Sequence, residues 1–85
     1  MPHTREEVLQ HIVSYLRTKL EGVAQIDENS HFTRDLNVDS LQVFETVGEL
    51  EETYDIVIPL ELLYRQKIQT VAELANEVMR LIEKN

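Results

Sequence analysis

The 85-residue sequence contains no cysteine and no tryptophan, and aromatic residues make up only 6% of it. Without cysteine the chain can form no disulfide, no thiolate nucleophile and no cysteine-based metal site, so any thiol chemistry needs a cofactor. Basic residues are also few: 8 Lys and Arg stand against 16 Asp and Glu, which gives a net charge of −8. This balance argues against nucleic acid and anionic membrane surfaces as partners, and it favours proteins with basic patches.

The sequence has no apolar run long enough to cross a membrane. Residues 1–7 contain neither a basic region nor an apolar stretch, so they do not form a signal peptide. We therefore expect a cytoplasmic protein without a membrane span. The length allows a single domain, 1–85, which we expect to be a monomer with a small aliphatic core.

The histidines do not have the spacing of metal ligands. His3 and His31 have no suitably spaced Asp, Glu or His partner, and His11 is expected to be a surface residue of a helix. Residues 27–29 are acidic but lack the glycine and the spacing of a calcium loop. No metal site is expected.

Apolar residues recur at helical spacing in three segments of the chain. The first and last segments each begin with the spacing of a capping box, Thr4 with Glu7 and Thr70 with Glu73. The three apolar stripes consist of Val8, Leu9, Ile12, Val13, Leu16 and Leu20; of Val43, Val47, Leu50 and Tyr54; and of Val71, Leu74, Ala75, Val78 and Ile82.

Two connections join the predicted helices. Residues 23–38 form an unusually long one, and four apolar residues can pin it to the core: Ile26, Phe32, Leu36 and Val38. Residues 56–58 are expected to be extended chain, and Pro59 favours a short helix over 60–64. The predicted fold is therefore all-α: a four-helix bundle of three principal helices and one short helix, with a long loop between the first and second helices.

The second helix is expected to begin at Asp39 or Ser40, because either side chain can cap a first helical turn. Gln42, three residues after Asp39, completes a partial capping box. The hydroxyl of Ser40 would be exposed at a helix N-terminus, where the negative charge of a phosphodiester is favoured. Serine is also a common cap, so these residues alone leave open whether Ser40 is an attachment point or only a cap.

The predicted second helix carries an acidic face. Glu45, Glu49 and Glu52 recur at helical spacing, roughly opposite the apolar stripe. No lysine or arginine lies within residues 35–64 to balance them. A surface of one sign suggests docking to basic partners, with electrostatic steering of the encounter.

Short motifs within residues 30–61 resemble those of the acyl carrier protein family. Asp39-Ser40-Leu41 matches the Asp-Ser-Leu signature at the start of the family's second helix. Upstream, Phe32-Thr33-Arg34-Asp35-Leu36 resembles the family's loop pattern. Downstream, residues 49–55 and then Ile56-Val57-Ile58-Pro59 resemble its acidic helix end and its Ile-x-Ile-Pro exit. Each motif is short, but their order and spacing together are specific.

The resemblance implies a four-helix bundle in which phosphopantetheine, donated by coenzyme A, is joined covalently to Ser40 and transports acyl thioesters between enzymes. Asp39 and Leu41 would flank the cofactor. The partners would be a phosphopantetheinyl transferase and acyl-transferring or synthase enzymes with basic docking patches. The implied partner-binding residues are Leu41, Phe44, Glu45, Gly48, Glu49 and Glu52.

Two positions depart from the family pattern. The family usually has glycine where this chain has Asn37, a residue that tolerates left-handed backbone. Gly48 stands where the family usually carries a larger apolar side chain that touches partners, and a mid-helix glycine costs roughly 1 kcal/mol relative to alanine. Leu41 is expected to be exposed beside the prosthetic group. Phe44 either packs or lines an acyl pocket, and packing is the favoured interpretation.

Nothing in the sequence indicates an enzyme, because Ser40 has no recognisable catalytic base and there is no glycine-rich phosphate loop. We predict a free-standing carrier, a phosphoprotein of lipid metabolism that serves fatty-acid or polyketide-type synthesis. Peptidyl carriers usually have glycine and histidine before the serine, where this chain has Val38 and Asp39. The alternative is an unmodified acidic helical adaptor that binds basic protein partners.

Overall fold

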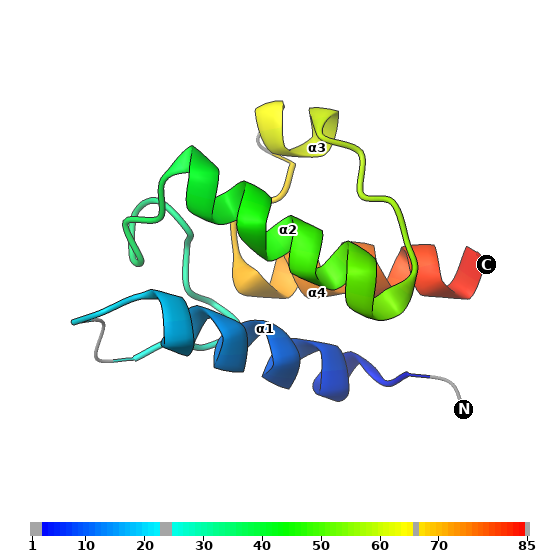
Figure 1. The fold of residues 1–85 in the computed structure, drawn as a ribbon, viewed down its shortest axis with the longest axis horizontal. Coiled ribbons are helices and arrows are strands. Elements are labelled where there is room, and N and C mark those ends of the chain that lie inside the picture. The colour runs from blue at the N-terminus through cyan, green and yellow to red at the C-terminus, as the bar shows by residue number, and fades with distance from the viewer. Residues whose placement is uncertain (1–2, 23–24, 66, 85) are drawn as a thin grey trace.

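Helices account for all the regular secondary structure in the described residues of the computed structural model, which are 3–22, 25–65 and 67–84. They are α1 (Arg5–Lys19), α2 (Ser40–Tyr54), α3 (Glu61–Tyr64) and α4 (Val71–Lys84). The predicted all-α fold, with three principal helices and one short helix, is confirmed. Helix α1 packs against both α2 and α4 and runs in the opposite direction to them, while the short α3 lies across α2 from α1 in the view of Figure 1.

Side-chain caps fix the starts of α1 and α4. Thr4 Oγ1 accepts a hydrogen bond from the main-chain N–H of Glu7 at 3.1 Å and caps α1. The carboxylate of Glu7 contacts the His3 ring, whereas a full capping box would direct it to the main chain of Thr4. At α4 the reciprocal pair is present: Thr70 Oγ1 accepts from the N–H of Glu73 at 3.2 Å, and the N–H of Thr70 donates to Glu73 Oε1 at 3.0 Å.

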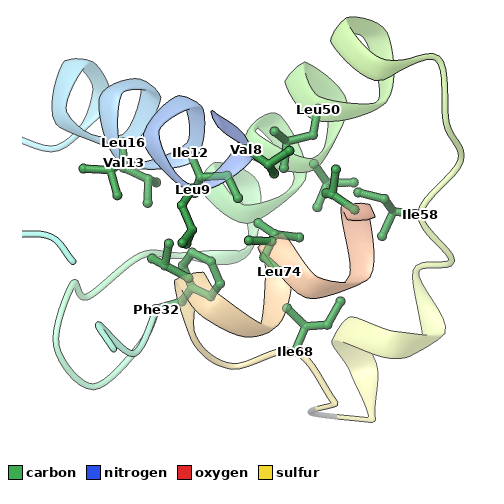
Figure 2. Close-up of a cluster of buried hydrophobic side chains, with 14 of the residues drawn as sticks. Val8, Leu9, Ile12, Val13, Leu16, Phe32, Leu50, Ile58, Ile68 and Leu74 are labelled. Carbon is green, nitrogen blue, oxygen red and sulfur yellow. The ribbon is translucent and has the colours of Figure 1, made fainter. Parts of the chain in front are cut away.

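The apolar stripes of the three long helices meet in one aliphatic core, part of which is shown in Figure 2. Ile12, Leu50 and Leu74 are fully buried there. The predicted anchors of the two connections are buried as well, which confirms that the connections are pinned to the core: Ile26, Phe32, Leu36, Val38, Ile56 and Ile58. Burial of these loop residues fixes the path of the chain into and out of α2.

The connection from α1 to α2 is tied to the start of α4. The N–H of Phe32 donates to the carbonyl of Gln69 at 2.9 Å, and the N–H of Val71 donates to the carbonyl of Ser30 at 3.1 Å. Asn37 adopts a left-handed conformation with φ of 53°, as the sequence led us to expect of asparagine at this position. The chain therefore enters α2 from a fixed position, at the end of the bundle away from both termini (Figure 1).

His11 is half-buried, so the prediction of a surface residue is wrong. Its Nε2 lies 2.9 Å from Glu49 Oε2, and its Nδ1 lies 3.0 Å from the hydroxyl of Tyr54. A carboxylate only accepts, so Nε2–H donates to Glu49, and in the neutral ring Nδ1 then accepts the Tyr54 hydroxyl proton. The ring therefore links α1 to the middle and end of α2.

Two kinds of feature are absent from residues 3–22, 25–65 and 67–84. No helix there is long and apolar enough to cross a membrane. No group of three or more His, Cys, Asp or Glu side chains within the same ranges could hold a metal ion.

Candidate functional site

The first turn of α2 shows which residue caps the helix. Asp39 has extended backbone, and its Oδ1 accepts from the N–H of Gln42 at 2.8 Å. Gln42 Oε1 accepts in return from the N–H of Asp39 at 3.1 Å, which completes the capping box. The sequence left Asp39 and Ser40 as alternative caps, and the structure selects Asp39. The cap therefore does not use the hydroxyl of Ser40.

The three serines of the chain differ in what surrounds their hydroxyl groups. Ser30 is buried, and its Oγ accepts from the N–H of Asp27 at 3.0 Å. Ser14 is exposed in the middle of α1. Ser40 is exposed at the first residue of α2. Of the three, Ser40 alone combines exposure with a helix N-terminus.

The start of α2 is electrostatically suited to an attached phosphate. The free N–H groups of a first helical turn and the helix dipole place partial positive charge at this end. The first turn of α2 contains no acidic residue that would already use this charge. Next to Ser40, Oδ1 of the Asp39 carboxylate already accepts the capping bond from the N–H of Gln42.

A cavity of about 330 Å³ opens beside Ser40. Its size lies at the lower end of the range found for small-molecule sites. Segments distant in sequence line it: the connection before α2, the first turns of α2, α3 and the chain before α4. The lining residues are His31, Phe32, Thr33, Val38, Asp39, Ser40, Val43, Phe44, Leu63, Ile68 and Gln69.

Phe44 lies at the edge of this cavity. Its side chain is 37% exposed and is not part of the buried core. Plain packing, the interpretation favoured from the sequence, is therefore wrong, and the alternative interpretation of a pocket edge fits the structure.

The outward face of α2 carries most of the predicted partner-binding residues. Leu41 is 66% exposed, and Glu45, Gly48 and Glu52 are also exposed. Glu49 differs, because its carboxylate accepts from His11 and from the hydroxyl of Thr53 at 3.2 Å.

Glu49 also affects a neighbouring titratable group. The pKa of the Tyr54 phenol is raised above its ordinary value, first by burial and then by the negative charges of Glu7 and Glu49. Within the acidic face, Glu49 is therefore partly committed to the contact between α1 and α2.

Sequence reasoning did not find the cavity residues that come after α2. Leu63, Ile68 and Gln69 lie more than twenty positions after Ser40. They follow no periodic pattern, because they belong to a short helix and to a loop rather than to a long amphipathic element. Only the packing of α3 and the following chain near the start of α2 brings them together.

The fold and this site together are typical of a small carrier domain, in which a helix start presents an attachment point beside a cavity. A family model described as a phosphopantetheine attachment site matches residues 6–78. The chain belongs to the acyl carrier protein family, whose members are carriers and not enzymes, and its cofactor is phosphopantetheine.

Curated relatives support the same assignment. The chain is 38% identical over 80 residues to the acyl carrier protein of Wolinella succinogenes, an alignment that covers 94% of this chain and 93% of the relative. It is 38% identical over 77 residues to that of Rubrobacter xylanophilus, covering 88% and 91%. It is 39% identical over 59 residues to that of Prochlorococcus marinus, covering 68% and 74%. Alignments with other curated relatives span about two thirds of each protein.

Proposed function

We propose that phosphopantetheine is attached to the hydroxyl of Ser40. The observation that supports this most strongly is that Asp39 and Gln42 complete the helix cap between them. An exposed hydroxyl at a helix N-terminus is therefore available for a phosphodiester, whose charge the N-terminus favours. Leu41, exposed beside it, would contact the attached arm or the enzyme that handles it.

The residues around Ser40 hold and present the group rather than activate it. No described His, Asp or Glu side chain forms a hydrogen bond to the Ser40 hydroxyl, so a base has to come from the transferase. The arm, when bound, supplies the terminal thiol on which an acyl group is held as a thioester. The cavity beside Ser40 offers apolar surface from Val43, Leu63 and Ile68 to a carried chain.

The cargo would pass between enzymes of fatty-acid or polyketide-type synthesis. Support comes from the relatives, which are named acyl carrier proteins, and from Val38 and Asp39, which differ from the residues usual in peptidyl carriers. We further propose a single domain over residues 1–85 that acts as a cytoplasmic monomer and carries phosphate through its arm. A net charge of −8 suits such a diffusible carrier.

Partner enzymes would dock on the outward face of α2. Leu41 and Phe44 provide apolar contact, while Glu45 and Glu52 provide the charge that steers basic surfaces. Gly48 lies between these residues on the helix, and a Cβ atom added there would meet nothing within 4 Å. Glu49 would contribute less, since His11 and Thr53 already bond its carboxylate. The partners include the phosphopantetheinyl transferase and the acyl-transferring or synthase enzymes.

The test is the intact mass of the protein before and after incubation with coenzyme A and a broad-specificity phosphopantetheinyl transferase. We expect wild type and Ser14→Ala to gain one phosphopantetheine and Ser40→Ala to gain none. Circular dichroism checks that each variant is folded. A folded wild-type protein that gains nothing with several transferases would contradict the proposal and support an unmodified adaptor.

A further inference from the structure

His31 has a ring whose orientation is fixed by the loop before α2. Its Nδ1 lies 3.2 Å from the main-chain nitrogen of Thr33 and 3.2 Å from that of Arg34. Main-chain N–H groups can only donate, so Nδ1 is the acceptor in both bonds. In the neutral ring the proton is therefore on Nε2.

The backbone of His31 is held on both sides. Its N–H donates to Asp35 Oδ2 at 2.8 Å, and its carbonyl accepts from the N–H groups of Asp35 and Leu36 at 3.0 and 3.1 Å. An isolated antiparallel bridge also pairs His31 with Thr70, just before α4. The half-buried ring cannot turn away without breaking the bonds to Nδ1.

His31 is also one of the residues that line the cavity beside Ser40. Within the described part of the chain, the bonds of the imidazole all go to Nδ1, and Nε2 has no hydrogen-bond partner. Water can satisfy Nε2–H while the cavity is open. A saturated chain that fills the cavity displaces this water and leaves the donor unpaired, which is unfavourable. A chain with an oxygen atom at this end of the cavity restores the bond.

We propose that His31 is a specificity-determining residue of this carrier: its Nε2–H, on the side of the ring away from the Nδ1 bonds, faces the cavity and donates a hydrogen bond to a hydroxyl or carbonyl oxygen of the carried acyl chain. The cavity then favours oxygenated chains over saturated chains of the same length. The inference rests on the proposed function, because it requires a chain attached through Ser40.

A purely structural role for His31 makes a different prediction. Capping the turn over residues 32–36 requires one acceptor, and the hydroxyl of serine provides one. Histidine provides the same acceptor and adds a donor on the opposite side of the ring. His31→Ser therefore keeps an acceptor for the cap and removes the Nε2–H donor on the far side of the ring. His31→Asn also keeps an acceptor for the cap.

The experiment compares octanoyl and β-hydroxyoctanoyl chains, loaded from the corresponding coenzyme A thioesters by a broad-specificity transferase. Intact mass first confirms one loaded group per protein. The rate of thioester cleavage by hydroxylamine is then measured for the loaded protein and for the corresponding free pantetheine thioester. The rate for the free thioester is divided by the rate for the protein. This ratio reports how well the cavity shields each chain, and it removes the intrinsic difference between the two thioesters.

We expect wild type to protect the hydroxylated chain about tenfold better than the saturated chain, which is the effect of roughly one net hydrogen bond. His31→Ser should lose this preference while its melting temperature stays close to that of wild type. An equal preference in wild type and His31→Ser, or none in wild type, would overturn the proposal. A protein that gains no mass refutes the attachment at Ser40 instead, so the two failures are distinguishable.

A measurement on wild type keeps the test valid if the His31 variants do not fold. The imidazole nitrogen chemical shifts, followed by NMR, should change at Nε2 of His31 when the hydroxylated chain is loaded and stay nearly constant with the saturated chain. Equal changes with both chains would show that the arm common to both forms, and not the cargo, contacts the ring, and would overturn the proposal.

Discussion

The inner and outer faces of α2 differ in what holds their residues in place. On the inner face Val47 and Leu50 are buried in the core, and the Thr46 hydroxyl donates to the carbonyl of Gln42 at 2.8 Å. On the outer face Leu41 and Gly48 are exposed to solvent. The inner-face residues are needed to fold the chain, whereas nothing in the described fold requires the outer-face residues.

The residues that stabilise the fold and the residues available to partners therefore lie on different faces of α2. Exposed apolar side chains are ordinary when single, but Leu41 and Phe44 stand together beside the candidate attachment point. Changes on the inner face should therefore affect stability first, and changes on the outer face should affect encounters with other proteins.

The largest effect is expected from Leu50→Ala on the inner face. Leu50 is 0% exposed, and removing its side chain leaves a cavity that should lower the free energy of unfolding by about 2–5 kcal/mol. Leu41→Ala is the matched control on the outer face and should change it by less than about 0.5 kcal/mol. Urea denaturation measures both values, and similar losses for the two variants would contradict the separation of the faces.

A charge reversal on the outer face should slow partner encounter without unfolding the chain. We expect the double variant Glu45→Lys and Glu52→Lys to reduce the rate of modification by the transferase about tenfold at low salt. The difference should shrink as salt rises, because exposed charges are screened. Glu83→Lys, on α4, is the control for changed charge elsewhere. A reduction that does not depend on salt would exclude electrostatic steering.

Gly48→Ala should raise the stability of the fold and lower the rate of reaction with partner enzymes. An added Cβ meets nothing within 4 Å, so the variant should gain about 1 kcal/mol of stability from helix propensity and melt about 4–8 °C higher. Its rate with partner enzymes should fall if they approach the helix backbone closely at this position. Ser14→Ala, exposed on α1, controls for helix propensity alone. An unchanged partner rate would remove Gly48 from the docking surface.

The smallest effect concerns the end of α2. The pKa of Tyr54 is raised above 10.0, mainly by burial. The folded state therefore keeps its phenol protonated while the unfolded state ionises, so this contribution to stability is present below pH 10.0 and is lost as pH rises through the folded pKa. Ultraviolet titration should show a late-ionising tyrosine that disappears in Tyr54→Phe; an unchanged titration would show that another tyrosine is responsible.

Patterns that repeat along the chain predicted most of the fold. The apolar stripe through Val8, Ile12 and Leu16 and the capping pair of Thr70 and Glu73 are local features, and the structure contains both. The conformation of Asn37 was also predictable, because few residues tolerate left-handed backbone.

Contacts between segments were not predictable in this way. The bonds from His11 to Glu49 and Tyr54 join residues about forty positions apart, so no local spacing indicates them. The same limit applies to Phe44, whose position at a cavity edge depends on where Leu63 and Ile68 pack. These parts of the site depend on tertiary packing between distant segments, and local patterns in one sequence do not reveal such packing.

The most direct test of the central claim is to locate the attached group after transferase treatment. Trypsin cleaves after Arg34 and Arg65, and the peptide that it releases, 35–65, contains Ser40 as its only serine. The account predicts that the entire mass of phosphopantetheine is found in this peptide by tandem mass spectrometry, on Ser40. Location of the group in a peptide that contains Ser14 or Ser30 would contradict the account.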